Sequence, residues 1–426
     1  MDSLLVRGGR PLVGTVEIKG AKNAALPILA ATVLHGGTYM IENCPDISDV
    51  DAAAEILRVL GGWTIRNGNT LLVDTRGIDR WCIPGSLMVR IRASVLFLGP
   101  LLARFGRAEL TMPGGCPLGS RPIDLHLQAM ASMGASVTLR DGVISCEASG
   151  LHGCSIAFSF PSVGATENAL LAATACCGTV TITNAAMEPE ITDLIDFLRT
   201  MGAEISGTGS NRLTVHGGLQ LQDAVYRVMP DRIETATYLC AAAACGGAVT
   251  LLHTDGSLLK PVLDGLVQAG CVAEEDEGGL HLWSDGSLQA IGQITTAPYP
   301  GFPTDAQALM MAAMLRATGE TRFSETVFDM RFGHGVQMRR FGGQIDTYGN
   351  SARVRGVRQL YGAKAEADDL RAAAALVIAA LQTPEESVIT GIKHLHRGYD
   401  NLEGNLRTLG AEIRNKTTGN FNEYSV

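Results

Sequence analysis

A cysteine and an arginine lie five residues apart in a glycine- and proline-rich segment, residues 113–122. The sequence of this segment, PGGCPLGSRP, is too irregular for a helix or a strand and predicts an exposed loop. A thiol on such a loop, close to cations, can have a lowered pKa and act as an acid or a nucleophile. Cys116, near Arg121, is therefore a candidate reactive thiol, and on these residues alone a bystander thiol on a turn stays open as the alternative.

Polar and charged residues also stand at the starts of six apolar segments that are expected to be helices. They are Lys22, Asn23, Arg92, Ser162, Thr166, Asp231, Arg232, Glu234, Thr304, Asp305, Asp369 and Arg371. The N-terminus of a helix attracts anions, because its dipole and its free backbone N–H groups carry partial positive charge. Asp, Ser and Thr can be simple helix caps there. The cations Lys22, Arg92 and Arg371 oppose the dipole, so they predict an anionic ligand.

These residues belong to a unit that is repeated six times along the chain. Each unit has a glycine near the end of an amphipathic segment, and successive glycines are 68 to 73 residues apart. The six glycines are Gly61, Gly134, Gly202, Gly270, Gly342 and Gly410. Such a glycine is typical of the left-handed cap of a helix, and the segment after it alternates like a β-hairpin. We expect each unit to be a buried helix, a strand, an outer helix and a hairpin.

Three such units can enclose one core, with their buried helices inside and their sheets outside, so six units predict two similar domains. The strand before Lys22 has no unit of its own, and we expect it to complete the C-terminal domain. The predicted domains are residues 22–230, which carry the Cys116 loop, and residues 1–21 with 231–426. Two chain crossings between them would act as a hinge.

Composition excludes several classes of protein. The net charge of −9 argues against a nucleic-acid-binding protein, which needs a basic face. Asp2, Arg7 and Arg10 interrupt what would have to be an apolar signal region, so we expect a cytoplasmic protein. The apolar stretch 236–252 is broken by glycines and predicts no membrane span. The ten cysteines lack the spacing of a disulfide framework and are expected to be mostly buried thiols.

Several phrases resemble those of the UDP-N-acetylglucosamine 1-carboxyvinyltransferase family of enolpyruvyl transferases, and the likeness covers almost the whole chain. The most distinctive are GAKNAALP at 20–27, PGGCPLGSRPIDLHL at 113–127, PSVGATENA at 161–169, GFPTDAQA at 301–308, ETVFDMRF at 325–332 and HRGYD at 396–400. The resemblance implies an α/β fold, namely a two-domain inside-out α/β barrel in which each domain has three βαβαββ-like repeats. It also implies transfer of the enolpyruvyl group of phosphoenolpyruvate to the 3-hydroxyl of UDP-N-acetylglucosamine, the first committed step of peptidoglycan precursor synthesis.

The resemblance also implies roles for individual residues. Lys22, Arg121 and Arg397 would hold the phosphate and carboxylate of phosphoenolpyruvate, Cys116 would protonate its methylene carbon, and Asp305 would accept the proton of the sugar hydroxyl. The residues expected to bind substrate are Lys22, Asn23, Arg92, Arg121, Pro122, Ile123, Asp124, Leu125, Asp305, Val327, Arg331, Arg371 and Arg397. Both expected partners are small molecules, and neither a metal nor a cofactor is required.

Two other functions stay open on the sequence. The first is transfer of the same group to shikimate 3-phosphate, which enzymes of this fold perform without a cysteine loop. The second is a catalytically quiet paralogue that acts through protein contacts. His394 and His396 share a face of an expected strand, but no third ligand has suitable spacing, so a metal pair is not predicted. The sequence does not predict the oligomeric state.

Overall fold

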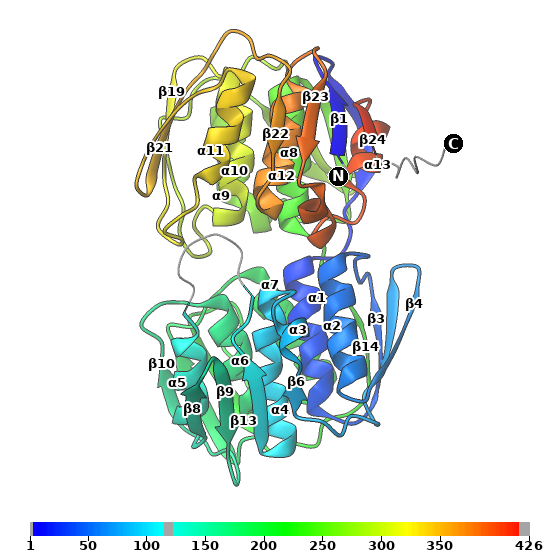
Figure 1. Cartoon of the computed structure of the whole chain (residues 1–426), viewed down its shortest axis with the longest axis vertical. Coiled ribbons are helices and arrows are strands. Elements are labelled where there is room, and N and C mark those ends of the chain that lie inside the picture. The colour runs from blue at the N-terminus through cyan, green and yellow to red at the C-terminus, as the bar shows by residue number, and fades with distance from the viewer. Residues whose placement is uncertain (1–2, 115–121, 417–426) are drawn as a thin grey trace, which may run out of the picture. The chain divides into compact units, whose positions relative to one another are not determined.

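The computed structural model describes residues 3–114 and 122–416 and divides the chain into two compact units. Unit 1 consists of Met1–Ile18, Arg232–Ala297 and Gly301–Val426. Unit 2 consists of Lys19–Asp231 together with Pro298–Pro300. Each unit contains three four-stranded sheets, so the six predicted repeats are confirmed as six sheets (Figure 1).

Unit 2 has a helical interior and sheets on its outside (Figure 1). The inner helices α1 (Lys22–Ala31), α4 (Leu98–Phe105) and α6 (Val163–Ala173) are apolar and largely buried, whereas α2 (Ser48–Val59), α5 (Asp124–Ser132) and α7 (Pro189–Thr200) each keep an exposed face. The first sheet has the strand order β14 (Ala224–Arg227), β3 (Thr38–Glu42), β5 (Thr70–Asp74) and β4 (Trp63–Asn67). The second has the order β6 (Cys82–Ile83), β7 (Arg107–Thr111), β9 (Val143–Glu147) and β8 (Ser136–Arg140). The third has the order β10 (Ser155–Ala157), β11 (Gly178–Thr183), β13 (Arg212–Gly217) and β12 (Glu204–Ser206).

Unit 1 repeats this plan. Its inner helices are α8 (Arg232–Cys245), α10 (Thr304–Ala313) and α12 (Leu370–Leu381), and its outer helices are α9 (Lys260–Gln268), α11 (Gly333–Met338) and α13 (Leu402–Thr408). One sheet has the strand order β22 (Lys364–Glu366), β23 (Ser387–Thr390), β1 (Ser3–Arg7) and β24 (Glu412–Lys416). Another has the order β16 (Val272–Asp276), β17 (Gly279–Ser284), β15 (Gly247–Leu252) and β2 (Leu12–Glu17). The last has the order β18 (Gln293–Thr295), β19 (Glu320–Ser324), β21 (Ser351–Arg355) and β20 (Gln344–Tyr348).

The glycines that recur along the sequence end the outer helix or helical segment of each repeat. All six have positive φ, between 90° and 111°, which confirms the predicted left-handed conformation. A side chain is strained at such a φ, so glycine is the residue that ends the helix here at least cost. The hairpins expected after the second and third glycines are also confirmed, as β8–β9 and β12–β13.

The first two strands of the chain belong to unit 1. β1 lies between β23 and β24, and β2 pairs in parallel with β15. The last strand of unit 2 before α8 is β14, and it pairs in parallel with β3 of the same unit. The two segments that leave these strands meet at a bridge between Gly20 and Pro230, and the Asp231 N–H donates to the Lys19 carbonyl at 2.8 Å.

One expected element is wrong. His394 and His396 do not lie on a strand but in the 3-10 helix η6 (Ile392–Arg397). The preceding Gly391 has φ of 75°, which ends the extended chain after β23. Among residues 3–114 and 122–416, no helix has the length and apolar character that a membrane span requires.

Candidate functional site

The predicted binding residues of unit 2 stand at the beginnings of helices. Lys22 and Asn23 are the first two residues of α1, and Arg92 begins the 3-10 helix η2 (Arg92–Phe97). Asp124 and Leu125 begin α5. Just before them Pro122 is exposed and Ile123 is buried. The first turn of a helix generally presents backbone N–H groups that can bind an anion or a polar ligand.

Lys22 has carboxylate neighbours that sequence reasoning missed. Its Nζ lies 2.6 Å from an oxygen of Asp49, the second residue of α2, and both side chains are largely buried. Its backbone N–H donates to the Asp231 carboxylate at 3.2 Å, so a residue 209 positions away caps α1. Asp49 thus supplies negative charge beside the cation at this helix start, and an anionic ligand at Lys22 stays a prediction. The signal in the sequence was an acidic first turn in the next helix of the same repeat.

Asn168 connects the elements that carry Arg92 and Asp124. This side chain in α6 is fully buried. Its carbonyl oxygen accepts from the Gly99 N–H at 2.8 Å, and its amide donates to the Val95 carbonyl at 2.8 Å. The same amide nitrogen lies 2.8 Å from Nδ1 of His126, which then acts as an acceptor. Asn168 thus ties α6 to η2, α4 and α5. Its place in the phrase PSVGATENA was the available signal in the sequence.

The predicted residues of unit 1 include a cluster around one carboxylate. Asp305, in the first turn of α10, accepts from the Arg331 guanidinium at 2.8 Å and from the Arg371 guanidinium at 3.0 Å. The side chains of Arg331 and Arg371 are 4% and 5% exposed, while that of Asp305 is 29% exposed. Arg371 also contacts the hydroxyl of Tyr399 at 3.4 Å. Two buried cations therefore fix the orientation of a carboxylate that still reaches solvent and could bond to a ligand.

Glu325 holds the loop that precedes Arg331, and sequence reasoning assigned it no role. Its buried carboxylate accepts from the hydroxyls of Thr296 and Thr304 at 2.8 and 2.9 Å. It also accepts from the backbone N–H of Val327 at 2.8 Å and of Phe328 at 3.2 Å. Thr304 directly precedes Asp305, so one carboxylate sets both the loop with Val327 and the start of α10. Its position at the head of the phrase ETVFDMRF was the available signal.

The structure thus brings Asp305, Arg331 and Arg371 into direct contact, and Val327 joins them through Glu325. Arg397 is the last residue of η6, which packs against α12. Lys22, Asn23, Arg92, Pro122, Ile123, Asp124 and Leu125 belong to the other unit. Cys116 and Arg121 lie outside the described residues.

His334 lies in α11, and its lowered pKa leads us to expect that the free energy of unfolding depends on pH. Burial lowers its pKa to about 4, with the Arg331 charge adding to this effect and the Asp369 carboxylate opposing it. The folded-state pKa is below the unfolded value of about 6.5, so the unfolded chain binds more protons between these pH values. The free energy of unfolding should therefore fall as the pH drops through this window, by up to about 1.4 kcal/mol per pH unit from this residue.

The measurement is urea unfolding of wild type and His334→Gln at a series of pH values from 7 to 4. In the variant, the free energy of unfolding should depend less steeply on pH, by the contribution of about one proton, whatever its absolute stability. Equal slopes for the two proteins would show that His334 is not the residue responsible.

Comparisons with known proteins place these features in context. Residues 6–406 match the family model of EPSP synthase (3-phosphoshikimate 1-carboxyvinyltransferase). The UDP-N-acetylglucosamine 1-carboxyvinyltransferases of Desulfosudis oleivorans and Xylella fastidiosa are both 44% identical to this chain, over 98% of this chain and 100% of each relative.

Solved structures agree. The enolpyruvyl transferase NikO from Streptomyces tendae is 28% identical with a TM-score of 0.86, over 98% of this chain and 99% of that one. An EPSP synthase from Acinetobacter baumannii is 18% identical with a TM-score of 0.75, over 98% of this chain and 100% of that one, which is a likeness of fold alone. These likenesses and the six sheets confirm the predicted α/β fold with three repeats in each half.

Proposed function

Because the chain belongs to the EPSP synthase family, and within it to the UDP-N-acetylglucosamine 1-carboxyvinyltransferases, we propose that it joins the enolpyruvyl group of phosphoenolpyruvate to the 3-hydroxyl of UDP-N-acetylglucosamine. Phosphate is the other product. The observation that carries this function is the 44% identity to enzymes of that name over nearly the full length of both chains. This reaction is the first committed step of peptidoglycan precursor synthesis, and we propose that it takes place in the cytoplasm.

The shikimate alternative has less support. The EPSP synthases among the solved structures share 18% and 19% of their residues with this chain, which is enough to show the fold and too little to carry over an acceptor substrate. The curated relatives that carry the UDP-N-acetylglucosamine name are 41% to 44% identical. The nucleotide sugar is therefore the acceptor that we propose.

In the proposed mechanism, Cys116 protonates the methylene carbon of phosphoenolpyruvate, and a cation forms at the adjacent carbon. The sugar 3-hydroxyl attacks this carbon while Asp305 accepts its proton, and the product is a tetrahedral ketal that still carries phosphate. Loss of phosphate and of a proton from the methyl group restores the double bond. Such steps need a positioned acid, a positioned base and fixed cations near the departing phosphate.

We assign the cations and the binding residues as follows. Lys22, Arg121 and Arg397 hold the phosphate and carboxylate of phosphoenolpyruvate. Asn23, Arg92, Pro122, Ile123, Asp124, Leu125, Val327, Arg331 and Arg371 contact or orient the nucleotide sugar. The contacts of Asn168 support this assignment for unit 2, since they hold the starts of η2 and α5 in one arrangement. The contacts of Glu325 support it for unit 1.

The test is release of inorganic phosphate by the purified full-length protein. We expect release only when phosphoenolpyruvate and UDP-N-acetylglucosamine are both present, and a nucleotide-sugar product heavier by the enolpyruvyl group. Replacing the sugar with shikimate 3-phosphate should give no release above background. Release with shikimate 3-phosphate alone as acceptor, or no release with either acceptor, would overturn the proposal.

Glu325 should act as a positioning residue for the nucleotide sugar. Glu325→Ala leaves two hydroxyls and two N–H groups without their acceptor, and each such buried group costs about 1–3 kcal/mol. We expect the loop with Val327 to loosen and the KM for UDP-N-acetylglucosamine to rise at least about 10-fold, with a smaller change in the KM for phosphoenolpyruvate.

Two further variants separate this role from a general loss of stability. Glu325→Gln keeps an acceptor oxygen for the three donors at Oε1 and should recover most of the affinity. Glu320→Ala, at the start of β19 on the outward face of the sheet, breaks exposed ion pairs with Arg322 and Arg355 and should leave both KM values unchanged. A rise in both KM values by the same factor in Glu325→Ala would contradict the positioning role.

A further inference from the structure

The outer faces of the three sheets of unit 2 differ in chemistry, although the sheets are built alike. In each sheet one row of outward side chains crosses all four strands in register. In the β10–β11–β13–β12 sheet this row is Ser155, Thr181, Thr214 and Ser206. In the β6–β7–β9–β8 sheet it is Cys82, Glu109, Ser145 and Thr138. In the β14–β3–β5–β4 sheet it is Val225, Met40, Leu72 and Ile65. Only the last of these three rows is apolar throughout.

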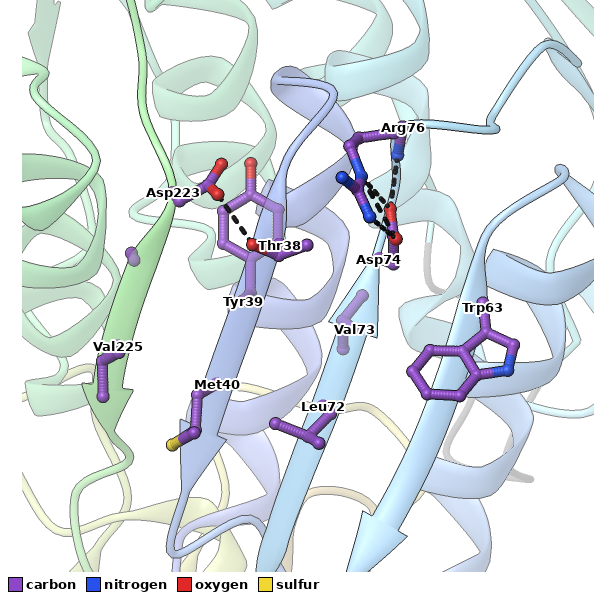
Figure 2. Close-up of a pocket in the computed structure, with 11 residues that line it drawn as sticks. Thr38, Tyr39, Met40, Trp63, Leu72, Val73, Asp74, Arg76, Asp223 and Val225 are labelled. Carbon is purple, nitrogen blue, oxygen red and sulfur yellow. Dashed lines mark hydrogen bonds and ion pairs between the residues drawn. The ribbon is translucent and has the colours of Figure 1, made fainter.

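This apolar row is accessible to solvent. Val225 is 61% exposed, Ile65 44% and Met40 38%, and Trp63 beside them on β4 is 52% exposed. Figure 2 shows Val225, Met40 and Leu72 side by side on neighbouring strands. Together with Trp63, these residues line part of a cavity of about 480 Å³. Single exposed apolar residues are ordinary, but a contiguous patch with a tryptophan is typical of a surface that another protein covers.

An acidic and a basic side chain lie on opposite sides of the apolar row, at equal distances from Val225 along the chain. Asp223 and Arg227 lie two residues before and two residues after Val225, and all three side chains are exposed. A strand rises about 3.3 Å per residue, so Asp223 and Arg227 are about 13 Å apart and do not pair with each other. The hydrogen bond from Thr38 holds the pKa of Asp223 below its usual range, so its carboxylate is charged at neutral pH.

We propose that this face binds the same face of a second copy of the chain, with a two-fold axis that runs along the Val225–Met40–Leu72–Ile65 row. Rotation about this axis places each apolar residue of the row over its own counterpart. It also reverses the strand direction, so Asp223 of one copy faces the partner's Arg227, and the same contact forms a second time. An isologous interface must be self-complementary in this way. The two packed sheets would keep the usual face-to-face separation of about 10 Å.

A second apolar row exists in unit 1 and serves as the internal competitor. It consists of Val13, Ala248, Trp283 and Val272 in the β16–β17–β15–β2 sheet. The next outward row of this sheet is Thr15, Thr250, His281 and Glu274, and no acid and base flank Val13 symmetrically as Asp223 and Arg227 flank Val225. The charge pattern therefore favours the unit 2 face.

Sedimentation velocity of the full-length protein over a range of concentrations tests the proposal. Wild type should form a concentration-dependent dimer. Met40→Glu should raise the dimer dissociation constant at least about 10-fold, because it places two carboxylates together at the centre of the interface. Thr181→Glu, at the matching outward position of the β11 sheet, should leave the dissociation constant unchanged. Circular dichroism confirms that each variant is folded.

A charge exchange tests the two-fold geometry itself. Asp223→Arg alone and Arg227→Asp alone each bring like charges together twice and should weaken the dimer about 10-fold. The double variant restores opposite charges and should regain most of the wild-type affinity. A wild-type protein that stays monomeric up to its solubility limit would overturn the proposal and leave the face to a different protein. Dissociation by Val13→Glu but not by Met40→Glu, or a double variant no better than the single ones, would also overturn it.

Discussion

We expect Asp305→Asn to lower the turnover number at least about 100-fold, because the proposed proton acceptor loses its basic oxygen. The nucleotide sugar should still bind, because the amide keeps the size and most of the hydrogen-bonding capacity of the carboxylate. The prediction is a fall in kcat with little change in the dissociation constant, measured by steady-state phosphate release and by isothermal titration calorimetry.

The contacts of Asp305 give this prediction a second, structural part. An amide oxygen can still accept from Arg331, but the amide NH2 group then faces the Arg371 guanidinium, and two donors do not bond to each other. We expect a loss of stability of about 1–3 kcal/mol from this unpaired group. Asp346→Asn is the matched control, since Asp346 pairs with Arg355 at 3.3 Å on the exposed side of the same unit. Near-normal turnover in Asp305→Asn would remove Asp305 as the proton acceptor.

We expect Cys116→Ala to abolish covalent labelling by a phosphonate epoxide that resembles phosphoenolpyruvate. Turnover should fall at least about 100-fold through loss of the proposed acid. The labelling should be selective because most other thiols are protonated at neutral pH. Burial raises the pKa of Cys44 to about 11 and the pKa values of Cys146, Cys176 and Cys245 to about 12. Intact-protein mass spectrometry should show one label per wild-type chain and none in the variant.

Cys177 provides the control for this experiment, because its side chain is exposed and the reagent can therefore reach it. Cys177→Ala should label and turn over like wild type. The exposed Cys82 is a weaker competitor, since burial and the neighbouring Glu109 carboxylate raise its pKa. Undiminished labelling of Cys116→Ala would reject Cys116 as the reactive thiol and would send the search to Cys177.

Local features of the chain could be predicted well because they depend on neighbouring residues. The period of the recurring glycines and the apolar spacing before them determined six helix ends with positive φ and two hairpins. The placement of candidate residues at the starts of helices followed from the same pattern, as with Lys22, Asp305 and Arg371. The strand expected at His394 failed because Gly391 turns the chain there, and a glycine is permissive of several backbone conformations.

The sequence by itself determined the repeats, the fold class and the candidate residues, because periodicity, glycine caps and family phrases are written in consecutive residues. Only the tertiary structure decided which side chains meet. Asp49 pairs with Lys22, and two arginines hold Asp305. Asn168 bonds to residues 42 to 73 positions away along the chain, and Glu325 bonds to Thr304 and Thr296, 21 and 29 positions away. The apolar row on the β14–β3–β5–β4 sheet likewise appears only when four strands are aligned in register. Contacts of this kind depend on the packing of distant segments, which local propensity does not specify.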